Sequence, residues 1–194
     1  SVQAINALGW EDSHRALQFI DWLSSLVQRH GLLIDTVKSA SADASFRRYF
    51  RIHSDSRSFI LMDAPPDKEN SAPFVKIAEL IQAAGLRGPE VLNWHEAHGF
   101  MLLTDLGNAT MMSAIDAERP QANHGLYMQA VDALIAWQLS SKPGVLPPYD
   151  ETLLQRELSL FPDWYLTQHR QLEVQGKMRS TLDSTFKMLV AHNL

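Results

Sequence analysis

The stretch SADASFRRYFRI, residues 41–52, is the most informative segment of the sequence for the fold. Small and polar residues over positions 39–45 predict a turn. After that turn two sets of side chains alternate, Phe46, Arg48, Phe50 and Ile52 in one set and Arg47, Tyr49 and Arg51 in the other. Because a repeat of two residues is typical of a β-strand, the sequence predicts a strand over 46–52 with different side chains on its two faces.

The arginines at positions 47, 48 and 51 permit three interpretations. They can lie in solvent or in salt bridges, they can contact the phosphates of a small ligand, or they can bind nucleic acid. The chain carries a formal net charge of −5, which argues against nucleic acid, because that binding depends on many Lys and Arg contacts to phosphates. The first two interpretations stay open.

Further strands flank this one in the chain. Apolar residues recur at helical spacing over 13–30, where Asp12 or Ser13 caps the start and Gly31 ends the helix. Residues 32–38 and 58–62 predict two short strands. Three successive strands with short connections predict an antiparallel meander.

The rest of the chain divides into a mixed part and a helical part. The pattern predicts a helix over 71–84, strands over 90–95 and 100–104, and then helices over 108–117, 121–140, 150–170 and 177–192. The third of these later helices should be interrupted near Pro162, because proline lacks the N–H that a helix uses. The order predicts an α+β protein with its boundary near residue 107.

The composition excludes several classes of chemistry. The 194 residues include no cysteine, which excludes disulfides, zinc–thiolate sites and thiol catalysis. No apolar run approaches the roughly 18 residues of a membrane-spanning helix, and the N-terminus lacks the basic start and apolar middle of a signal peptide. We therefore expect a cytoplasmic protein without membrane or nucleic-acid partners.

Four segments together resemble a known family. They are ASADASFRRYFRI (40–52), ILMDAPPDKEN (60–70), FMLLTDLG (100–107) and YDETLLQRELSLFPDWYL (149–166). They resemble the bacterial branch of the aminoglycoside phosphotransferase/choline kinase superfamily, and within it the sugar kinases that phosphorylate the anomeric hydroxyl of N-acetylmuramate and N-acetylglucosamine in cell-wall recycling. The likeness runs from about residue 12 to the C-terminus.

The resemblance implies a protein-kinase-like fold. Residues 1–107 would be the nucleotide-binding small lobe, a five-stranded antiparallel sheet with one helix. Residues 108–194 would be the first helices of an all-α large lobe. The implied activity is that of a transferase, an ATP-dependent kinase that moves the γ-phosphoryl group to a hydroxyl of an amino sugar, with ATP and Mg²⁺ as cofactors.

The resemblance also implies where ATP binds. The turn after the first strand would lie over the phosphates, with its backbone N–H groups pointing at phosphate oxygens. The hinge after strand 100–104 would hold adenine through backbone groups, between apolar side chains. The implied ATP-binding residues are Ser41, Ala42, Asp43, Ser45, Arg47, Arg51, Ile60, Leu103, Thr104, Asp105, Leu106 and Gly107.

The helical part offers candidates for binding the sugar. Carboxylates suit sugar hydroxyls and aromatic rings suit pyranose faces, so we expect Arg156, Glu157, Asp163 and Trp164 to contact the acceptor. Helix packing and surface charge are the alternative interpretation of these residues.

The sequence departs from the kinase pattern in the third strand. Kinases place a lysine there to hold the α- and β-phosphates, and the alignment of ILMD puts Asp63 at that position. Either another cation replaces the lysine, with Arg47, Arg51, Lys68 and Lys76 as candidates, or the alignment is displaced by a few residues. A reversed pair between Asp63 and Lys76 is a further alternative.

The second departure concerns catalysis. The pattern H-x-D-x-x-x-x-N, which supplies the catalytic Asp and a Mg²⁺ ligand in this fold, begins at none of the eight histidines. We expect that the chain is a fragment truncated before its catalytic loop, that it holds no catalytic or metal-binding residue, and that it is inactive alone. We also expect a homodimer through apolar surface that the truncation exposes.

Two functions remain as hypotheses. The first is a fragment of a small-molecule kinase that acts on an amino sugar. The second is a non-catalytic, pseudokinase-like binding or regulatory module, which the absent loop and Asp63 favour.

Overall fold

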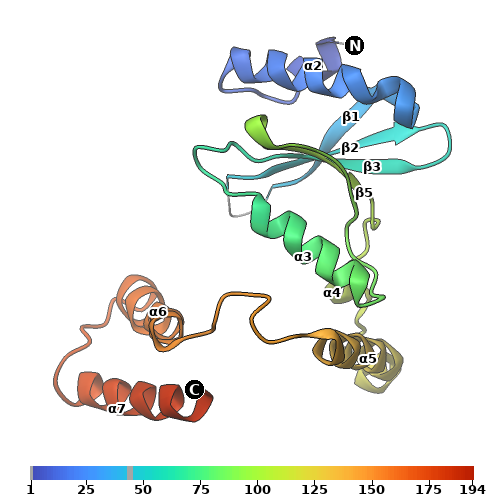
Figure 1. Cartoon of the computed structure of the whole chain (residues 1–194). Coiled ribbons are helices and arrows are strands. Elements are labelled where there is room, and N and C mark those ends of the chain that lie inside the picture. Colours follow the sequence, from blue (N-terminus) through green and yellow to red (C-terminus); the bar gives the residue numbers. More distant parts are fainter. Residues whose placement is uncertain (1, 43–45) are drawn as a thin grey trace. The chain divides into compact units, whose positions relative to one another are not determined.

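The structure is a computed structural model that describes residues 2–42 and 46–194. Within these residues five strands form one antiparallel sheet, in the order β1-β2-β3-β5-β4 (Figure 1). The elements that build it are β1 Leu32–Ala42, β2 Arg48–Ser54, β3 Ser58–Asp63, α3 Ala72–Ala83, β4 Val91–His95 and β5 Phe100–Thr104. The predicted α+β arrangement, a five-stranded antiparallel sheet with one helix between its third and fourth strands, is confirmed.

The first two strands differ in length from the prediction. β1 continues to Ala42, beyond residue 38, and β2 begins at Arg48 rather than at residue 46. The ladder explains both bounds, because Ala42 pairs with Arg48 at its end. Phe46 lies outside the ladder with 63% of its surface exposed, and its backbone N–H donates to the Glu69 carboxylate at 3.3 Å.

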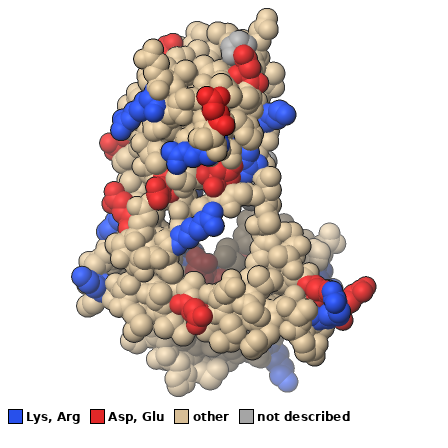
Figure 2. Space-filling view, turned by 90° about the vertical axis from the view of Figure 1, so that its right-hand side faces the viewer, with Lys and Arg blue, Asp and Glu red and all other residues tan. Residues whose placement is uncertain are grey.

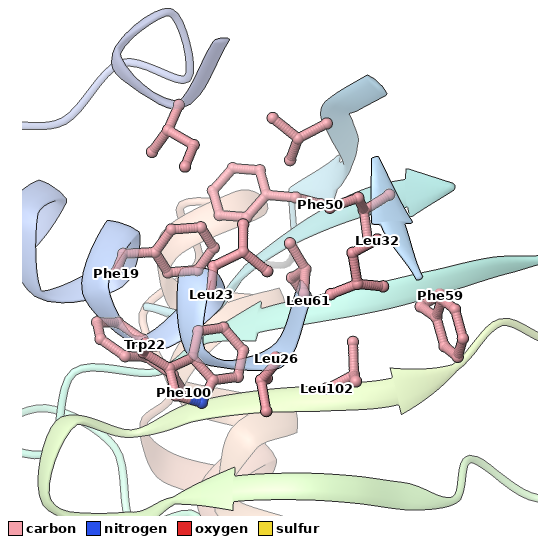
Figure 3. Packing of buried hydrophobic residues seen from close by; sticks show 13 residues of the cluster. Phe19, Trp22, Leu23, Leu26, Leu32, Phe50, Phe59, Leu61, Phe100 and Leu102 are labelled. Atoms are coloured by element: carbon pink, nitrogen blue, oxygen red, sulfur yellow. The ribbon is translucent and has the colours of Figure 1, made fainter. Parts of the chain in front are cut away.

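Two helices, α1 (Val2–Asn6) and α2 (Ser13–His30), cover one face of the sheet. In Figure 3 the side chains of Phe19 and Leu23 on α2 point toward Phe50 and Phe100 on the strands. Phe19 and Phe100 meet edge to face, with ring centroids 5.2 Å apart. Burial of a large apolar side chain contributes about 1.5–3 kcal/mol, so this layer accounts for much of the stability of the sheet.

The bounds of α2 coincide with the predicted helix. The Asp12 side chain accepts a hydrogen bond from the N–H of His14 at 2.8 Å, and Gly31 ends the helix with φ of 63°. The short helix α1 was not predicted, because five residues are too few to show a helical period.

Helix α3 lies on the opposite face of the sheet (Figure 1). Phe74 from this helix packs with Met62, Met101 and Leu103. Along β3, therefore, Phe59 and Leu61 face α2, whereas Ile60 and Met62 face α3. The alternation follows from the two-residue repeat of a strand.

The first two helices after β5 are shorter than predicted. They are α4 Met111–Ala114, the 3₁₀ turn η2 Pro120–Asn123 and α5 His124–Ser140. The side chain of Thr110 caps α4, and the 3₁₀ turn replaces the first residues expected for α5. These helices and the sheet form one compact unit, Ser1–Ser140.

Residues Ser141–Leu194 form a second compact unit. It contains α6 (Glu151–Leu160), the π-helix η3 (Phe161–His169) and α7 (Gly176–Asn193). The predicted interruption near Pro162 is confirmed as a change from α- to π-helix, since proline cannot donate the backbone hydrogen bond that would continue the α-helix. The expected lobe boundary at residue 107 stays a prediction.

Candidate functional site

A cavity of about 400 Å³ opens on the α3 face of the sheet. It lies where β2, β3, α3 and the segment that follows β5 come together. Its lining residues are Ala40, Tyr49, Arg51, Ile60, Phe74, Pro89, Leu103, Thr104, Asp105, Leu106, Gly107, Asn108 and Thr110. Seven of the twelve residues expected to bind ATP thus surround one cavity, namely Arg51, Ile60 and Leu103–Gly107.

The alternation along β2 decides which of its side chains reach this cavity. Tyr49 and Arg51 line it, whereas Phe50 and Ile52 are buried in the core against α2. The two faces predicted from SFRRYFRI are therefore real, and the face that carries Arg51 is the one that meets the cavity.

The segment after β5 is held by one carboxylate. Oδ2 of Asp105 accepts hydrogen bonds from Nε of Arg51 at 2.5 Å and from Oγ of Ser58 at 2.7 Å. Oδ1 accepts from Nη2 of Arg51 at 3.0 Å and from the backbone N–H of Gly107 at 2.9 Å. The Arg51 hydrogen bonds, helped by those from Ser58 and Gly107, hold the pKa of Asp105 well below its usual range, and the same carboxylate raises the pKa of Arg51.

Leu106 presents free backbone groups at the edge of the cavity. Thr104, two residues earlier, is already hydrogen-bonded, because its N–H donates to the carbonyl of Glu90 at 3.1 Å and its hydroxyl accepts from the Glu90 N–H at 2.9 Å. By contrast, no hydrogen bond found among residues 2–42 and 46–194 involves the backbone of Leu106. Ile60 and Leu103 are cross-strand partners on this face of the sheet, so a flat heterocycle that packs on them can be recognised by one N–H and one C=O of Leu106.

Arg47 lies beside the cavity rather than in it. It lines a neighbouring hollow of about 310 Å³ along α3, which shares Phe74 and Pro89 with the main cavity. Its Nε donates to Glu69 at 3.2 Å. Burial acts to lower the pKa of Arg47, but hydrogen bonding to Tyr49 and the charge of Glu69 raise it above the ordinary value.

The expected phosphate turn is described only at its edges. Asp43 and Ser45 lie outside the described residues. Ser41 and Ala42 form the end of β1, where their backbones pair with Tyr49 and Arg48. Their predicted contact with phosphate stays a prediction.

Asp63 lies on the other face of the sheet from the cavity and is 1% exposed. Arg15 on α2 donates to its Oδ1 from Nε at 2.9 Å and from Nη2 at 2.5 Å. Arg48 on β2 donates to its Oδ2 at 3.0 and 2.7 Å. The alignment that placed Asp63 at the phosphate-binding position is therefore wrong, and the pair with Lys76 is not the one that holds it in the described part of the chain.

The arginine cluster of the strand is ion-paired throughout. Arg47 meets Glu69, Arg48 meets Asp63 and Arg51 meets Asp105. On the face shown in Figure 2, Lys and Arg side chains are interspersed with Asp and Glu and form no continuous basic surface there. This agrees with the salt-bridge interpretation and gives nucleic-acid binding no support.

Sequence reasoning missed Arg15 as a structural partner. A signal was present, because Arg15 stands one and two helical turns before Phe19 and Trp22 on the buried side of α2. An arginine on an apolar stripe predicts a buried acidic partner. Tyr49, Phe74 and Pro89 were also missed as cavity walls.

The second unit contains a cavity of its own, of about 630 Å³, between α6, η3 and α7. Asp163 lines it together with Arg179, Asp183 and Lys187. The other three residues expected to bind a sugar are not among its walls. Arg156 and Glu157 pair with each other at 2.8 Å on the surface, and Trp164 is 66% exposed.

The described residues offer neither a cluster of metal ligands nor a helix that could span a membrane. Across residues 2–42 and 46–194, no three His, Asp or Glu side chains cluster in a way that could hold a metal ion. No helix in the same part of the chain has the length and apolar character needed to cross a membrane.

Comparison with known proteins gives consistent results. Residues 36–191 match the model of the phosphotransferase enzyme family. A protein of Pseudomonas aeruginosa named N-acetylmuramate/N-acetylglucosamine kinase is 49% identical over 138 residues, which cover 71% of this chain and 40% of the relative. Proteins of the same name from Pseudomonas putida and Neisseria meningitidis serogroup B are 39% identical over 155 residues and 35% identical over 178 residues.

Each match covers a larger share of this chain than of the relative. The Pseudomonas putida match covers 80% of this chain and 45% of the relative, and the Neisseria match covers 91% and 52%. The chain thus spans about half the length of the curated relatives it matches.

Proposed function

Because this chain belongs to the phosphotransferase enzyme family, we propose that it forms the nucleotide-binding part of an ATP-dependent kinase that phosphorylates a hydroxyl group of an amino sugar. The relatives are named for N-acetylmuramate and N-acetylglucosamine, so these two sugars are the proposed acceptors. The reaction joins the acceptor oxygen to the γ-phosphorus of ATP and breaks the bond from that phosphorus to the β–γ bridging oxygen.

The cavity beside the hinge is the observation that carries this proposal. Its volume of about 400 Å³ falls in the range of small-molecule sites. Ile60 and Leu103 supply apolar walls for adenine, and Leu106 supplies backbone groups for its polar edge. We propose that Arg47, which directly precedes β2 and lines the neighbouring hollow, contacts the phosphates together with the turn after β1.

The chain's own residues account for binding rather than for transfer. Because the H-x-D-x-x-x-x-N pattern does not occur in these 194 residues, no catalytic base is assigned. When bound, Mg²⁺ neutralises phosphate charge in such kinases, but the described residues offer no cluster of ligands for it. We propose that Asp163 and its cavity in the second unit contribute to the acceptor site.

One structural argument for the non-catalytic alternative no longer holds. That argument took Asp63 as a carboxylate facing the phosphates, and Asp63 instead pairs with Arg15 and Arg48 on the opposite face. On the α3 face of the sheet β3 presents Ile60, which lines the cavity, and Met62. The strand thus supplies no cation on that face, and we propose that the positive charge comes from the segment around the start of β2.

Calorimetric titration of the chain with ATP tests the proposal. We expect saturable binding that Ala40→Trp abolishes, because Ala40 is an exposed residue at the cavity where a large ring would block entry. Leu33→Trp, at an exposed position of the same strand but not at the cavity, is the matched control and should leave binding unchanged. Absence of ATP binding by the unsubstituted chain would refute the proposal.

Titration with N-acetylmuramate and N-acetylglucosamine, each with and without ATP, tests the acceptor. The cytoplasmic location, the role in cell-wall recycling and the homodimer remain predictions. Sedimentation analysis of the chain at several concentrations checks the last of these, and a monomer at all of them would contradict it.

A further inference from the structure

We propose that Arg51 is a positioning residue for the adenine base, acting through Asp105 on the hinge, and not a ligand of the phosphates. The inference rests on the nucleotide site of the proposed function. It begins with the place of the Asp105 carboxylate, which joins β2 through Arg51, β3 through Ser58 and the hinge through Gly107.

The carboxylate of Asp105 is fully occupied by this arrangement. Each of its two oxygens accepts two hydrogen bonds, at distances from 2.5 to 3.0 Å. The Asp105 side chain is 5% exposed and that of Arg51 is 22% exposed. If Arg51 turned away toward a phosphate, it would leave a nearly buried carboxylate without its counter-charge, which is strongly unfavourable.

The same guanidinium also holds the far end of the hinge. Nη2 of Arg51 donates to the carbonyl of Gly107 at 3.3 Å, and Gly107 has φ of 99°, a backbone conformation that favours glycine. Asp105 and Gly107 are thus fixed on both sides of Leu106. The backbone groups of Leu106, between them, make no hydrogen bond in the described part of the chain. We call the contacts of Arg51 and Asp105 with the hinge the clamp, and this clamp sets the direction in which the Leu106 groups meet a ligand.

One nitrogen of Arg51 is left for the alternative role, direct contact with the phosphates. Nη1 takes part in none of the hydrogen bonds found among residues 2–42 and 46–194, so it is the group that would touch a phosphate. The two roles make opposite predictions for ligands that carry only the base or only the phosphates.

The test measures the affinity of the chain for ATP, adenosine and inorganic tripolyphosphate. For Arg51→Ala we expect the affinities for ATP and adenosine to fall by the same factor, about tenfold or more, as for loss of charge-assisted hydrogen bonds, with tripolyphosphate binding unchanged. Asp105→Asn, which keeps Arg51, should show the same selectivity. Arg29→Ala removes an exposed arginine on α2, and as the charge-matched control it should alter none of the three.

Loss of ATP and tripolyphosphate binding with adenosine unchanged would overturn the inference, as would unchanged binding of all three. If Arg51→Ala does not fold, Arg51→Lys and Asp105→Asn decide by the same criteria. If the unsubstituted chain binds neither ATP nor adenosine, the proposed function fails instead. Amide hydrogen exchange then tests the arrangement without a ligand, at the Gly107 N–H that donates to Asp105: faster exchange of this amide in Arg51→Ala supports the inference, and unchanged exchange overturns it.

Discussion

Replacing Asp63 with asparagine should lower the free energy of unfolding more than the same substitution at an exposed aspartate. Asp63 is 1% exposed, and its side chain accepts four hydrogen bonds from Arg15 and Arg48. Asparagine has nearly the same volume, so it leaves no cavity. What changes is the charge, because two guanidinium groups then share one neutral amide.

The magnitude follows from the exposure of the two arginines. Removal of one partner from a buried ion pair costs about 3–5 kcal/mol. Arg15 is 16% exposed and Arg48 is 33% exposed, so water compensates part of the loss at Arg48. We therefore expect Asp63→Asn to lower the free energy of unfolding by about 3 kcal/mol, which is a large part of the roughly 5–15 kcal/mol that stabilises a typical domain.

Urea denaturation followed by tryptophan fluorescence measures this loss. Asp21→Asn, at an exposed position of α2, is the control and should change stability by no more than about 0.5 kcal/mol. Arg15→Gln combined with Asp63→Asn should be less destabilising than the sum of the two single changes, with a coupling of about 1 kcal/mol or more. A loss below about 1 kcal/mol for Asp63→Asn, or additive effects in the double variant, would refute the reasoning.

Three further predictions follow from individual residues. Asp105→Asn should destabilise the chain at neutral pH, and the difference from the unsubstituted chain should shrink as the pH falls below about 4. The lowered pKa keeps Asp105 ionised in the folded chain, whereas the unfolded chain takes up a proton there and so gains stability; urea midpoints across this range check it, and a constant difference contradicts it. Gly99→Ala should lower the free energy of unfolding by about 2 kcal/mol or more, because φ is +67° and a Cβ would stand 1.8 Å from the carbonyl oxygen of Ala64. Thermal unfolding should show this as a clearly lower melting temperature. The ring of His98 should titrate below the ordinary value of about 6.5, because burial and then the neighbouring charge of His95 lower its pKa; an NMR titration at or above that value would contradict this.

Much of the fold could be predicted because its signals are local. The helix at 13–30 shows several turns of apolar repeat between a capping Asp12 and a terminal Gly31, and the structure places α2 at those residues. The strand bounds were less predictable, since they depend on pairing between chain segments. β2 begins at Arg48 because the ladder with β1 ends there, and nothing within residues 46–52 marks that position.

The candidate site could be predicted in part, for a similar reason. Ile60, Leu103 and the hinge were implied by a family resemblance, and they line one cavity. The place of Arg15 on an apolar stripe predicts a buried acidic partner, but not which one, because Arg15 lies 48 positions before Asp63 in the sequence and Arg51 lies 54 positions before Asp105. Only the folded sheet brings these pairs together.

The misplacement of Asp63 shows how sensitive a strand is to register. A shift of one residue transfers every side chain to the other face. An alignment shifted by one residue therefore puts Met62 in place of Asp63 at the position of the kinase lysine, and Met62 packs on the α3 side of the sheet, where the cavity lies. Since β3 then offers no cationic side chain there, we expect the charge that meets the phosphates to come from the arginines around the start of β2. The candidates are Arg47, directly before β2, and Arg51 on β2, and Arg51 is bound to the hinge. We therefore expect loss of tripolyphosphate binding in Arg47→Ala but not in Arg51→Ala, and the reverse result would contradict this reasoning.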